Sequence, residues 1–146
     1  MSAFLKPLEI RWSDLDPNFH LRHSVYYDYG AYARICFLDE HGLTAAYMAA
    51  HQFGPILFRE ECMFRKEIRL GDSISIDLEL LAAREDLSRW TIRHNIRKND
   101  DTIAAIITVE GAWMDIAKRK LTVPPAKVLE VFNTMTKSPE FTWINK

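Results

Sequence analysis

The chain has 146 residues, with 20 acidic and 19 basic side chains and a formal net charge of −1. Its length and its 48% of hydrophobic residues are those of one globular domain, 1–146, that can bury a core. Nucleic acid is excluded as the main partner, because binding a phosphate backbone requires a basic surface. No segment approaches the roughly 20 apolar residues of a membrane span. The N-terminus shows no secretory signal and two cysteines make no disulfide framework, so we expect a cytoplasmic protein.

The first part of the chain is predicted to form one strand and one long helix. Residues 8–12 alternate apolar and polar side chains, which is typical of a strand. A polar loop at 13–23 follows. Apolar residues then recur at helical spacing on most sides, so we expect a buried helix that is capped by Ser24 and runs to about His41. Gly42 is its expected stop, because glycine is common just after a helix.

The hydrophobic pattern changes to period two after a short helix predicted at 44–52. The four expected strands are 56–70, 73–81, 87–98 and 102–115. The last of them is apolar on both faces, so it should lie in the centre of its sheet. A turn is expected at 99–101 and a short helix at 126–136. One strand, one long helix and four strands in succession predict the α+β class with an antiparallel sheet.

Polar side chains are densest where the first strand is expected to give way to the helix. The segment 11–29 holds carboxylates, two imidazoles and three phenols. A helix N-terminus offers unpaired N–H groups to negatively charged ligands. Polar groups gathered at such a junction are therefore placed like those of a catalytic site.

This segment resembles the signature of the hotdog-fold acyl-CoA thioesterases, the 4-hydroxybenzoyl-CoA thioesterase-like family. That family reads Arg-x-x-Asp-x-Asp-x-x-Gly-His-Val-Asn-Asn-x-x-Tyr-x-x-Tyr, followed in the same helix by Ala-Arg. The matching residues here are Arg11, Asp14, Asp16, His20, Tyr26, Tyr29, Ala33 and Arg34. The departures are Phe19, Arg22 and His23. Weaker matches around 69–72 and 113–124 extend the resemblance over nearly the whole chain.

The resemblance implies a hotdog fold, in which a curved antiparallel sheet of about five strands wraps a long central helix. It implies hydrolysis of an acyl-CoA or acyl-carrier-protein thioester, without a cofactor and without a metal. It also implies a homodimer or homotetramer with active sites between subunits. Such an assembly agrees with the open edge that a single curved sheet would leave. The acyl group and the choice between coenzyme A and carrier protein stay open.

Asp16 matches the catalytic aspartate of the family, which implies a nucleophile or a general base. A thiol with a pKa of about 8.5 leaves without a strong acid, so one carboxylate and a helix N-terminus could suffice. His20 matches the histidine that shapes the family's site and positions the thioester, and it is the second candidate catalytic residue. Asp14 is better explained by turn chemistry, which aspartate favours.

The three departures are candidate substrate contacts. Phe19 replaces a glycine, so we expect either that the chain takes another path there or that Phe19 narrows the pocket. Arg22 and His23 replace two asparagines and bring positive charge beside Asp16. That charge could hold Asp16 ionised, or could bind a substrate carboxylate or a phosphate of coenzyme A.

Further candidates come from the start of the helix and from the second strand. Backbone N–H groups near Ser24 and Val25 are expected to polarise the thioester carbonyl, and Tyr26 to hydrogen-bond near the site. Glu60 shares the parity of apolar residues on its strand, so either a bulge shifts the parity or Glu60 is a functional acid. Glu60 is therefore the second-choice acid, with the bulge favoured.

Two other functions are compatible with parts of the motif. A non-catalytic acyl-thioester-binding hotdog protein would account for the three departures. A hotdog enoyl-CoA hydratase would carry Asp-x-Asn-Pro-x-His after its long helix. Here the similar letters of 16–20 stand in another order and precede the helix, which disfavours hydration.

Overall fold

A computed structural model describes residues 3–99 and 101–145 of the chain. The middle of the turn expected at 99–101 lies outside the described residues. The helices are η1 (Trp12–Asp14), α1 (His23–Glu40), α2 (Ala45–Ala50) and α3 (Ala126–Phe132). The strands are β1 (Leu5–Leu8), β2 (Phe53–Phe64), β3 (Ile74–Asp77), β4 (Glu79–Ala83), β5 (Arg89–Arg97), β6 (Ile103–Asp115), β7 (Lys120–Leu121) and β8 (Lys137–Trp143).

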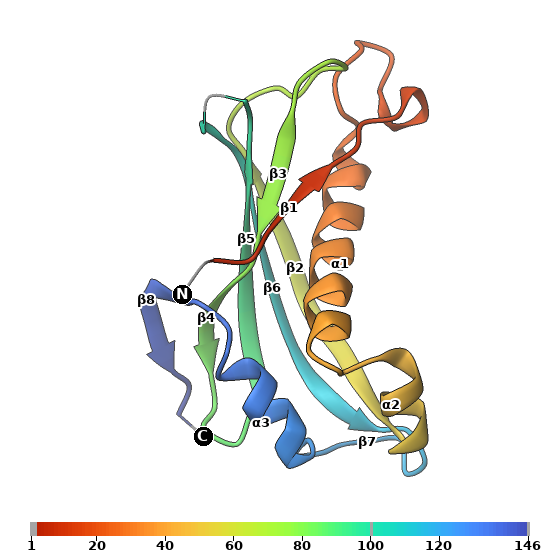
Figure 1. The fold of residues 1–146 in the computed structure, drawn as a ribbon, viewed down its shortest axis with the longest axis vertical. Helices are drawn as coiled ribbons and strands as arrows, with labels where there is room; N and C mark the ends of the chain where they lie inside the picture. The colour runs from red at the N-terminus through yellow and green to blue at the C-terminus, as the bar shows by residue number, and fades with distance from the viewer. Residues whose placement is uncertain (1–2, 100, 146) are drawn as a thin grey trace.

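A curved sheet wraps around α1 (Figure 1). Its antiparallel strands lie in the order β1-β3-β5-β6-β2, and β4 continues the line of β3 along β5. The strand β8 adds to the far side of β4 in parallel orientation. Five antiparallel positions around one long helix form the hotdog arrangement, so the α+β prediction is confirmed.

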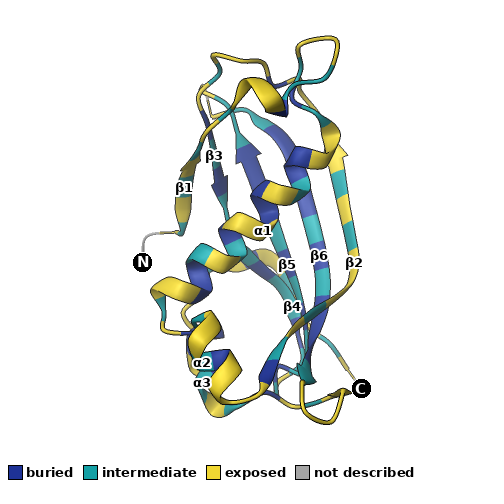
Figure 2. Ribbon diagram, turned by 90° about the vertical axis from the view of Figure 1, so that its right-hand side faces the viewer, coloured by how far each residue is buried: buried dark blue, intermediate teal, exposed yellow. Residues whose placement is uncertain are grey.

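The central and the edge strands differ sharply in burial. β6 pairs with β5 on one side and with β2 on the other, which confirms the central place expected for the strand at 102–115. Figure 2 shows β5 and β6 mostly buried and β2 mostly exposed. Within the described part of the chain, β2 pairs with β6 alone. Its outer backbone groups therefore form a free sheet edge.

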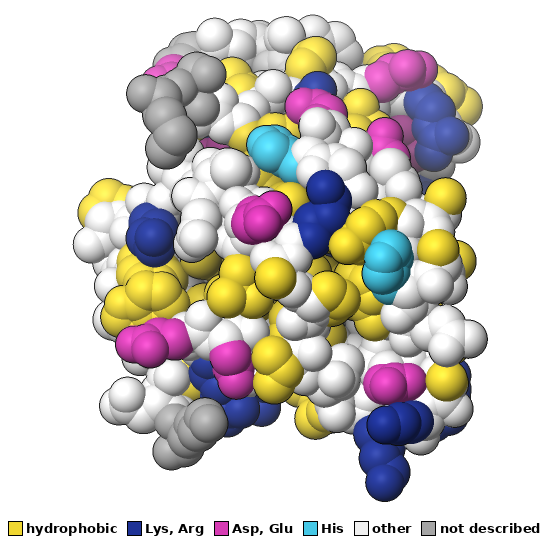
Figure 3. All heavy atoms as spheres, turned by 60° about the horizontal axis from the view of Figure 1, so that its bottom comes forward, with side chains coloured by type: hydrophobic (Ala, Val, Ile, Leu, Met, Phe, Trp, Pro, Cys, Tyr) yellow, Lys and Arg dark blue, Asp and Glu magenta, His cyan; other side chains and the backbone are white. Residues whose placement is uncertain are grey.

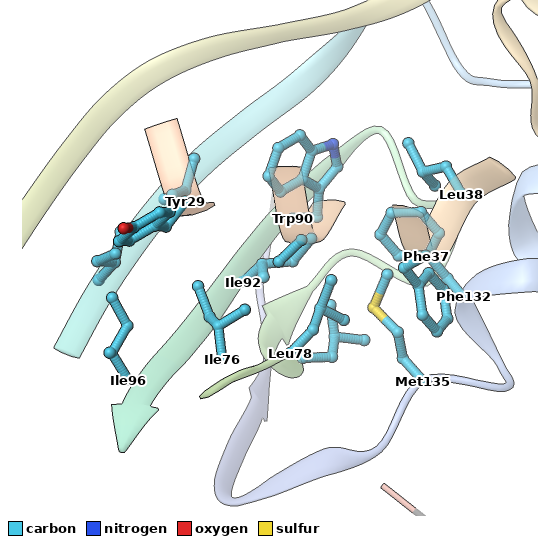
Figure 4. Close-up of a cluster of buried hydrophobic side chains, with 14 of the residues drawn as sticks. Tyr29, Phe37, Leu38, Ile76, Leu78, Trp90, Ile92, Ile96, Phe132 and Met135 are labelled. Carbon is cyan, nitrogen blue, oxygen red and sulfur yellow. The ribbon is translucent and has the colours of Figure 1, made fainter. Parts of the chain in front are cut away.

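The apolar core fills the space between α1 and the concave face of the sheet. Trp90 from β5, Phe37 from α1 and Phe132 from α3 converge there, and Met135 follows α3 (Figure 4). The pattern predicted a helix that is buried on most of its sides. This is wrong for the single chain, because Ile35 and its neighbours on the outer face of α1 are exposed. One face of α1 therefore remains uncovered in the single chain.

The first strand lies closer to the N-terminus than its pattern indicates. Residues 5–8 pair with β3, whereas Trp12 belongs to η1 and is 71% exposed. The Asp14 carboxylate accepts a hydrogen bond from the Arg11 N–H at 2.9 Å. This local turn competes with extended backbone, and the apolar–polar alternation of 8–12 does not report it.

The two strands expected at 56–70 and 73–81 also differ from the structure. β2 ends at Phe64, and the N–H groups of both following residues donate to the carbonyl of Ala104. The second expected strand is divided into β3 and β4. At the break, the Asp77 carboxylate accepts the N–H of Asn95 at 2.6 Å, so a side chain replaces a ladder bond.

The C-terminal segment holds a strand that the sequence pattern did not predict. The helix expected at 126–136 ends at Phe132, and β8 begins at Lys137. Pro139 within β8 and the mixed polarity of the segment conceal it, because proline is confined to edge strands. β8 covers the edge of β4 with a parallel partner.

Charges of both signs are mixed on the face of the molecule that Figure 3 brings forward. Acidic, basic and apolar side chains are interspersed there (Figure 3). Among the described residues, no helix combines the length and the apolar character needed to cross a membrane.

Candidate active site

The loop before α1 is held in place by the segment that follows β2. It makes two isolated antiparallel bridges, Leu15 with Leu21 and His20 with Arg69. The N–H of Leu21 donates to the carbonyl of Ile68 at 2.8 Å, and both side chains are buried. The loop is therefore an ordered platform at the N-terminal end of α1.

Asp14 fixes the start of this loop. Its side chain is 2% exposed, and it accepts hydrogen bonds from the backbone N–H, Nε and a terminal nitrogen of Arg11. The hydrogen bond from the Arg11 side chain lowers the pKa of Asp14, although burial opposes this. The geometry gives Asp14 the structural role that its turn chemistry indicates.

Only one of the two carboxylate oxygens of Asp16 accepts hydrogen bonds within the described residues. Its Oδ1 accepts the N–H of Asn18 at 2.9 Å and the N–H of His20 at 3.1 Å. Its own N–H donates to the His20 carbonyl at 2.8 Å. In the part of the chain that is described, Oδ2 has no hydrogen-bond partner. The loop thus orients the carboxylate and leaves one oxygen available to a substrate or a water.

Phe19 takes a left-handed backbone conformation, which glycine adopts more readily. Its φ is 66°, in the left-handed region that costs about 1–2 kcal/mol for a residue with a Cβ. Its ring is exposed and lies 6.0 Å from the Trp12 ring, between centroids. The ring therefore packs on the outside of the loop in the single chain, and a contact between Phe19 and the substrate stays a prediction.

His20 contributes its backbone to Asp16 and its ring to another residue. The imidazole Nε2 lies 3.3 Å from a carboxylate oxygen of Glu67. A hydrogen bond from Arg69, and then His20, lower the pKa of Glu67. The structure therefore places the His20 ring on the side of the loop that faces the segment after β2.

Arg22 ties the loop to the helix. Its NH1 donates to the carbonyl of Ser13 at 2.6 Å and its Nε to the hydroxyl of Ser24 at 3.0 Å. Its charge helps to lower the pKa of Asp14, after the larger effects of Arg11. Arg22 is thus engaged beside Asp14. His23 is exposed as the first residue of α1.

The helix starts two residues earlier than expected. Arg22, not Ser24, occupies the cap position, and no side chain caps the helix. The N–H of Val25 donates to the Arg22 carbonyl at 3.0 Å, so it is not available to a substrate. The first N–H groups of an α-helix have no acceptor within it. The N–H groups of His23 and Ser24 therefore replace the expected pair of Ser24 and Val25.

Tyr26 joins the loop to β2. Its ring meets that of Phe64 edge-on, with 4.8 Å between centroids. Burial raises the pKa of Tyr26 to about 12, and the nearby Cys62 and Asp16 add to the effect. The Tyr26 hydroxyl is therefore neutral, and Asp16 is near enough to influence its pKa. Burial also raises the pKa of Cys62 to about 11, so this cysteine is a thiol and not a nucleophile.

Glu60 faces α1 because a bulge shifts β2. The register changes between Leu57 and Arg59, which confirms the bulge that the parity of Glu60 indicated. A carboxylate oxygen of Glu60 lies 3.6 Å from Arg34 NH2. The second-choice acid is therefore engaged in an ion pair that is largely buried.

Arg34 also binds the core histidine. Its NH1 lies 3.2 Å from Nε2 of His94, whose Nδ1 lies 2.8 Å from the Asp77 carbonyl. A guanidinium can only donate, so Nε2 accepts and Nδ1 carries the hydrogen. Burial, and then the charge of Arg34, lower the pKa of His94 to about 3. Arg34 matches the family motif, but the motif alone does not show that it links α1 to two strands.

A cavity of about 200 Å³ flanks the second half of α1, and sequence reasoning did not find it. Its lining includes Trp90 and Trp113 from the sheet and Phe132 from α3. These aromatic residues are far apart in sequence, so no local pattern marks them as neighbours. Nowhere in the described residues do three or more His, Cys, Asp or Glu side chains gather as a metal would require.

Comparisons with known proteins agree with this geometry. A model of the thioesterase-like superfamily matches residues 10–132. No curated protein sequence matches the chain significantly. Among solved structures, the protein SAV2348 from Staphylococcus aureus, in complex with CoA, is 16% identical with a TM-score of 0.83, covering 94% of this chain and 88% of that one. The 1,4-dihydroxy-2-naphthoyl-CoA thioesterase Slr0204 from Synechocystis is 14% identical with a TM-score of 0.81, covering 91% and 97%. At such identities these structures show a shared fold.

Proposed function

The chain belongs to the thioesterase-like superfamily and is a thioester hydrolase, and we propose that it cleaves acyl-CoA thioesters with Asp16 as its catalytic carboxylate. The observation that carries this proposal is the asymmetric environment of Asp16. Two backbone N–H groups hold Oδ1, while Oδ2 is left without a partner in the described residues. A carboxylate held in this way is preorganised for attack or for proton abstraction.

The neighbouring groups supply the rest of the chemistry. The thioester carbonyl accepts hydrogen bonds from the His23 and Ser24 N–H groups at the positive end of α1. Asp16 Oδ2 either takes a proton from a water that attacks the carbonyl carbon, or attacks that carbon itself and forms an anhydride. Water hydrolyses this anhydride after the thiolate has left, which regenerates the carboxylate. The C–S bond breaks, and the thiolate leaves without a strong acid. The neutral Tyr26 hydroxyl is a further donor beside Asp16.

His20 acts as a positioning residue in this proposal. Its N–H supports Asp16 and its imidazole is held by Glu67, so it fixes the loop rather than the reacting atoms. Phe19 on the loop and His23 at the start of α1 are exposed, and in this proposal they contact the part of the substrate that projects from the site. Coenzyme A is the proposed leaving thiol, supported by the CoA that accompanies one structural relative.

The proposed active unit is a homodimer formed along β2. Its free edge carries large apolar side chains that are about half exposed, among them Leu57, Phe58, Met63 and Phe64. Pairing two copies of this edge would satisfy the open backbone groups and cover these side chains. Phe64 contacts Tyr26, so the interface would adjoin the site and complete it with residues of a second copy.

Thiol release tests this function directly. The panel should contain acyl-CoAs that differ in chain length and aromaticity, together with the same acyl groups on a carrier protein. Hydrolysis of at least one CoA ester supports the proposal. A parent protein that binds acyl-CoA without releasing thiol would instead be the acyl-binding protein that the Phe19, Arg22 and His23 departures would explain.

A further inference from the structure

The cavity beside α1 has a mouth at the surface and a closed aromatic end. Ala31 and Ile35 from α1 and Leu57 from β2 are exposed and form the mouth. Trp90 and Phe132 are buried at the other end, with ring centroids 6.4 Å apart. Figure 4 shows Phe132 and Met135 facing Phe37 of α1. A ligand that enters between α1 and β2 therefore meets a wall of aromatic rings.

The cavity wall offers almost nothing to a polar group. Arg34 is the one charged residue of the lining within the described chain, and it is engaged with Glu60 and His94. The indole N–H groups of Trp90 and Trp113 have no acceptor among the described residues, and both are closed to solvent by surrounding atoms. A hydroxyl or carboxylate placed here would lose its hydration without a new partner.

We propose that this cavity is the acyl subsite of the enzyme, and that it takes an apolar acyl group of about the size of one aromatic ring. The proposal rests on the thioesterase function above. A cavity of roughly 150 Å³ lined by apolar side chains holds benzene, and the cavity here is about 200 Å³. A phenyl ring with a short linker, or a branched alkyl group of equal bulk, fits this space. A long alkyl chain or a fused bicyclic ring exceeds it.

The thioester that lies at Asp16 of one copy places its acyl group in the cavity of the second copy. The lining on α1 begins at Ala31, seven residues after Ser24, which is about 10 Å along a helix. The ion pair of Arg34 and Glu60 joins α1 to β2, and Arg34 is itself part of the cavity lining. A ring-sized group on a thioester at its own Asp16 falls short of that distance. The mouth instead lies at the free edge of β2, where the second copy pairs.

Selectivity for the acyl group is the first expected consequence. Phenylacetyl-CoA should be hydrolysed with a higher kcat/KM than palmitoyl-CoA. Its 4-hydroxyphenyl analogue should be about 10- to 100-fold poorer, since an apolar pocket rejects an added hydroxyl to this extent. Equal kcat/KM values for the three esters would overturn the proposal.

Fluorescence locates the ligand independently of catalysis. The double variant Trp12→Phe/Trp143→Phe keeps Trp90 and Trp113, both in the cavity lining, as the two remaining tryptophans. With Asp16→Asn added to prevent turnover, 4-bromophenylacetyl-CoA should quench this emission through its bromine. Ala31→Phe should abolish the quenching, whereas Ala49→Phe on the exposed face of α2 should not. Saturable binding without quenching would disprove the cavity assignment even if hydrolysis is observed.

Mixed dimers test delivery from the second copy. Asp16→Asn and Ala31→Phe chains should each be inactive toward phenylacetyl-CoA when alone. After mixing and exchange, half of the dimers should be mixed. Each mixed dimer has two sites, and only one of them joins an unchanged Asp16 of one copy to an unchanged cavity of the other. About a quarter of the parent activity should therefore return. Delivery within one chain predicts no recovery, and that result would overturn this part of the proposal. Quenching without any thiol release would leave the subsite intact and refute the hydrolase function.

Discussion

His94 makes stability depend on pH. Its pKa is lowered to about 3 in the folded protein and is about 6.5 in an unfolded chain. Below pH 6.5, His94 therefore binds a proton in the unfolded state but stays neutral in the folded state. The free energy of unfolding should fall by up to about 1.4 kcal/mol per pH unit as the pH drops from 6.5 toward 4. Urea unfolding at pH 7 and at pH 5 measures this slope.

The matched control is another histidine. His51→Gln changes an exposed ring and should keep the slope, whereas His94→Gln should reduce it by about one proton. A His94→Gln variant that is less stable but has the parent's pH dependence would contradict the neutral, buried state of His94.

At the scale of single residues, motif spacing indicates which residues belong to the candidate site but does not indicate which contacts they make. Asp16 and Tyr26 could be proposed as site residues because the motif fixes their positions relative to the start of α1. The bonds from Arg22 to Ser13 and Ser24 could not be found, because they depend on how the loop folds back. The φ of 66° at Phe19 could not be found either, because phenylalanine disfavours the left-handed region. Tertiary contacts of the loop override the intrinsic preference of one residue.

At the scale of elements, β6 depends on one glycine. A Cβ at Gly111 would lie 2.4 Å from the Trp90 ring and 2.5 Å from the carbonyl oxygen of Ile56. Because the carbonyl belongs to the paired strand, neither neighbour can move away easily. Gly111→Ala should destabilise the protein by roughly 1–3 kcal/mol or more. Thermal and urea unfolding check this value.

Gly54→Ala is the matched comparison within the same pair of strands. The nearest atom to its added Cβ is a terminal carbon of Ile116 at 3.8 Å, which is an ordinary contact. The two variants should therefore differ clearly in stability. Similar midpoints for Gly54→Ala and Gly111→Ala would show that Trp90 does not pack over β6 as described.

The strands also show where sequence patterns stop being informative. β5 and β6 were predicted within two residues at each end because their alternation reflects burial on a sheet. The break between β3 and β4 was not, because the Asp77–Asn95 contact joins residues 18 apart in sequence. β8 escaped prediction for a similar reason, since its pairing with β4 is settled by the fold and not by its own composition.

At the scale of the whole molecule, the uncovered surface predicts self-association. Met63 on β2 and Ile35 on α1 are 55% and 54% exposed, and both lie beside the free edge. We expect a dimer, or a tetramer built from dimers, by light scattering at micromolar concentration. Met63→Lys should weaken the dimer, whereas Leu121→Lys, on the exposed β7, should not. A monomeric mass for the parent chain would refute both the dimer and the shared site.

The order of elements predicted the α+β class with an antiparallel sheet, because one long helix followed by antiparallel strands has few compact solutions, and the resemblance of the motif implied the hotdog fold. The cavity could not be predicted in the same way. Its wall is assembled from α1, β2, β5, β6 and α3, and its volume depends on how these elements pack. Fold class is therefore encoded locally in this chain, whereas the shape of the proposed acyl subsite is not.

The central claim, that Asp16 is the catalytic carboxylate, is tested most directly by kcat for thiol release in Asp16→Asn. Asparagine keeps an oxygen for the N–H groups of Asn18 and His20 and removes the charge, so the loop should persist. We predict a fall in kcat of about 10²–10⁴-fold with little change in KM or in the unfolding midpoint. Asp28→Asn, which changes an exposed carboxylate on α1, should keep the parent's kcat. Near-normal turnover by Asp16→Asn would contradict the assignment.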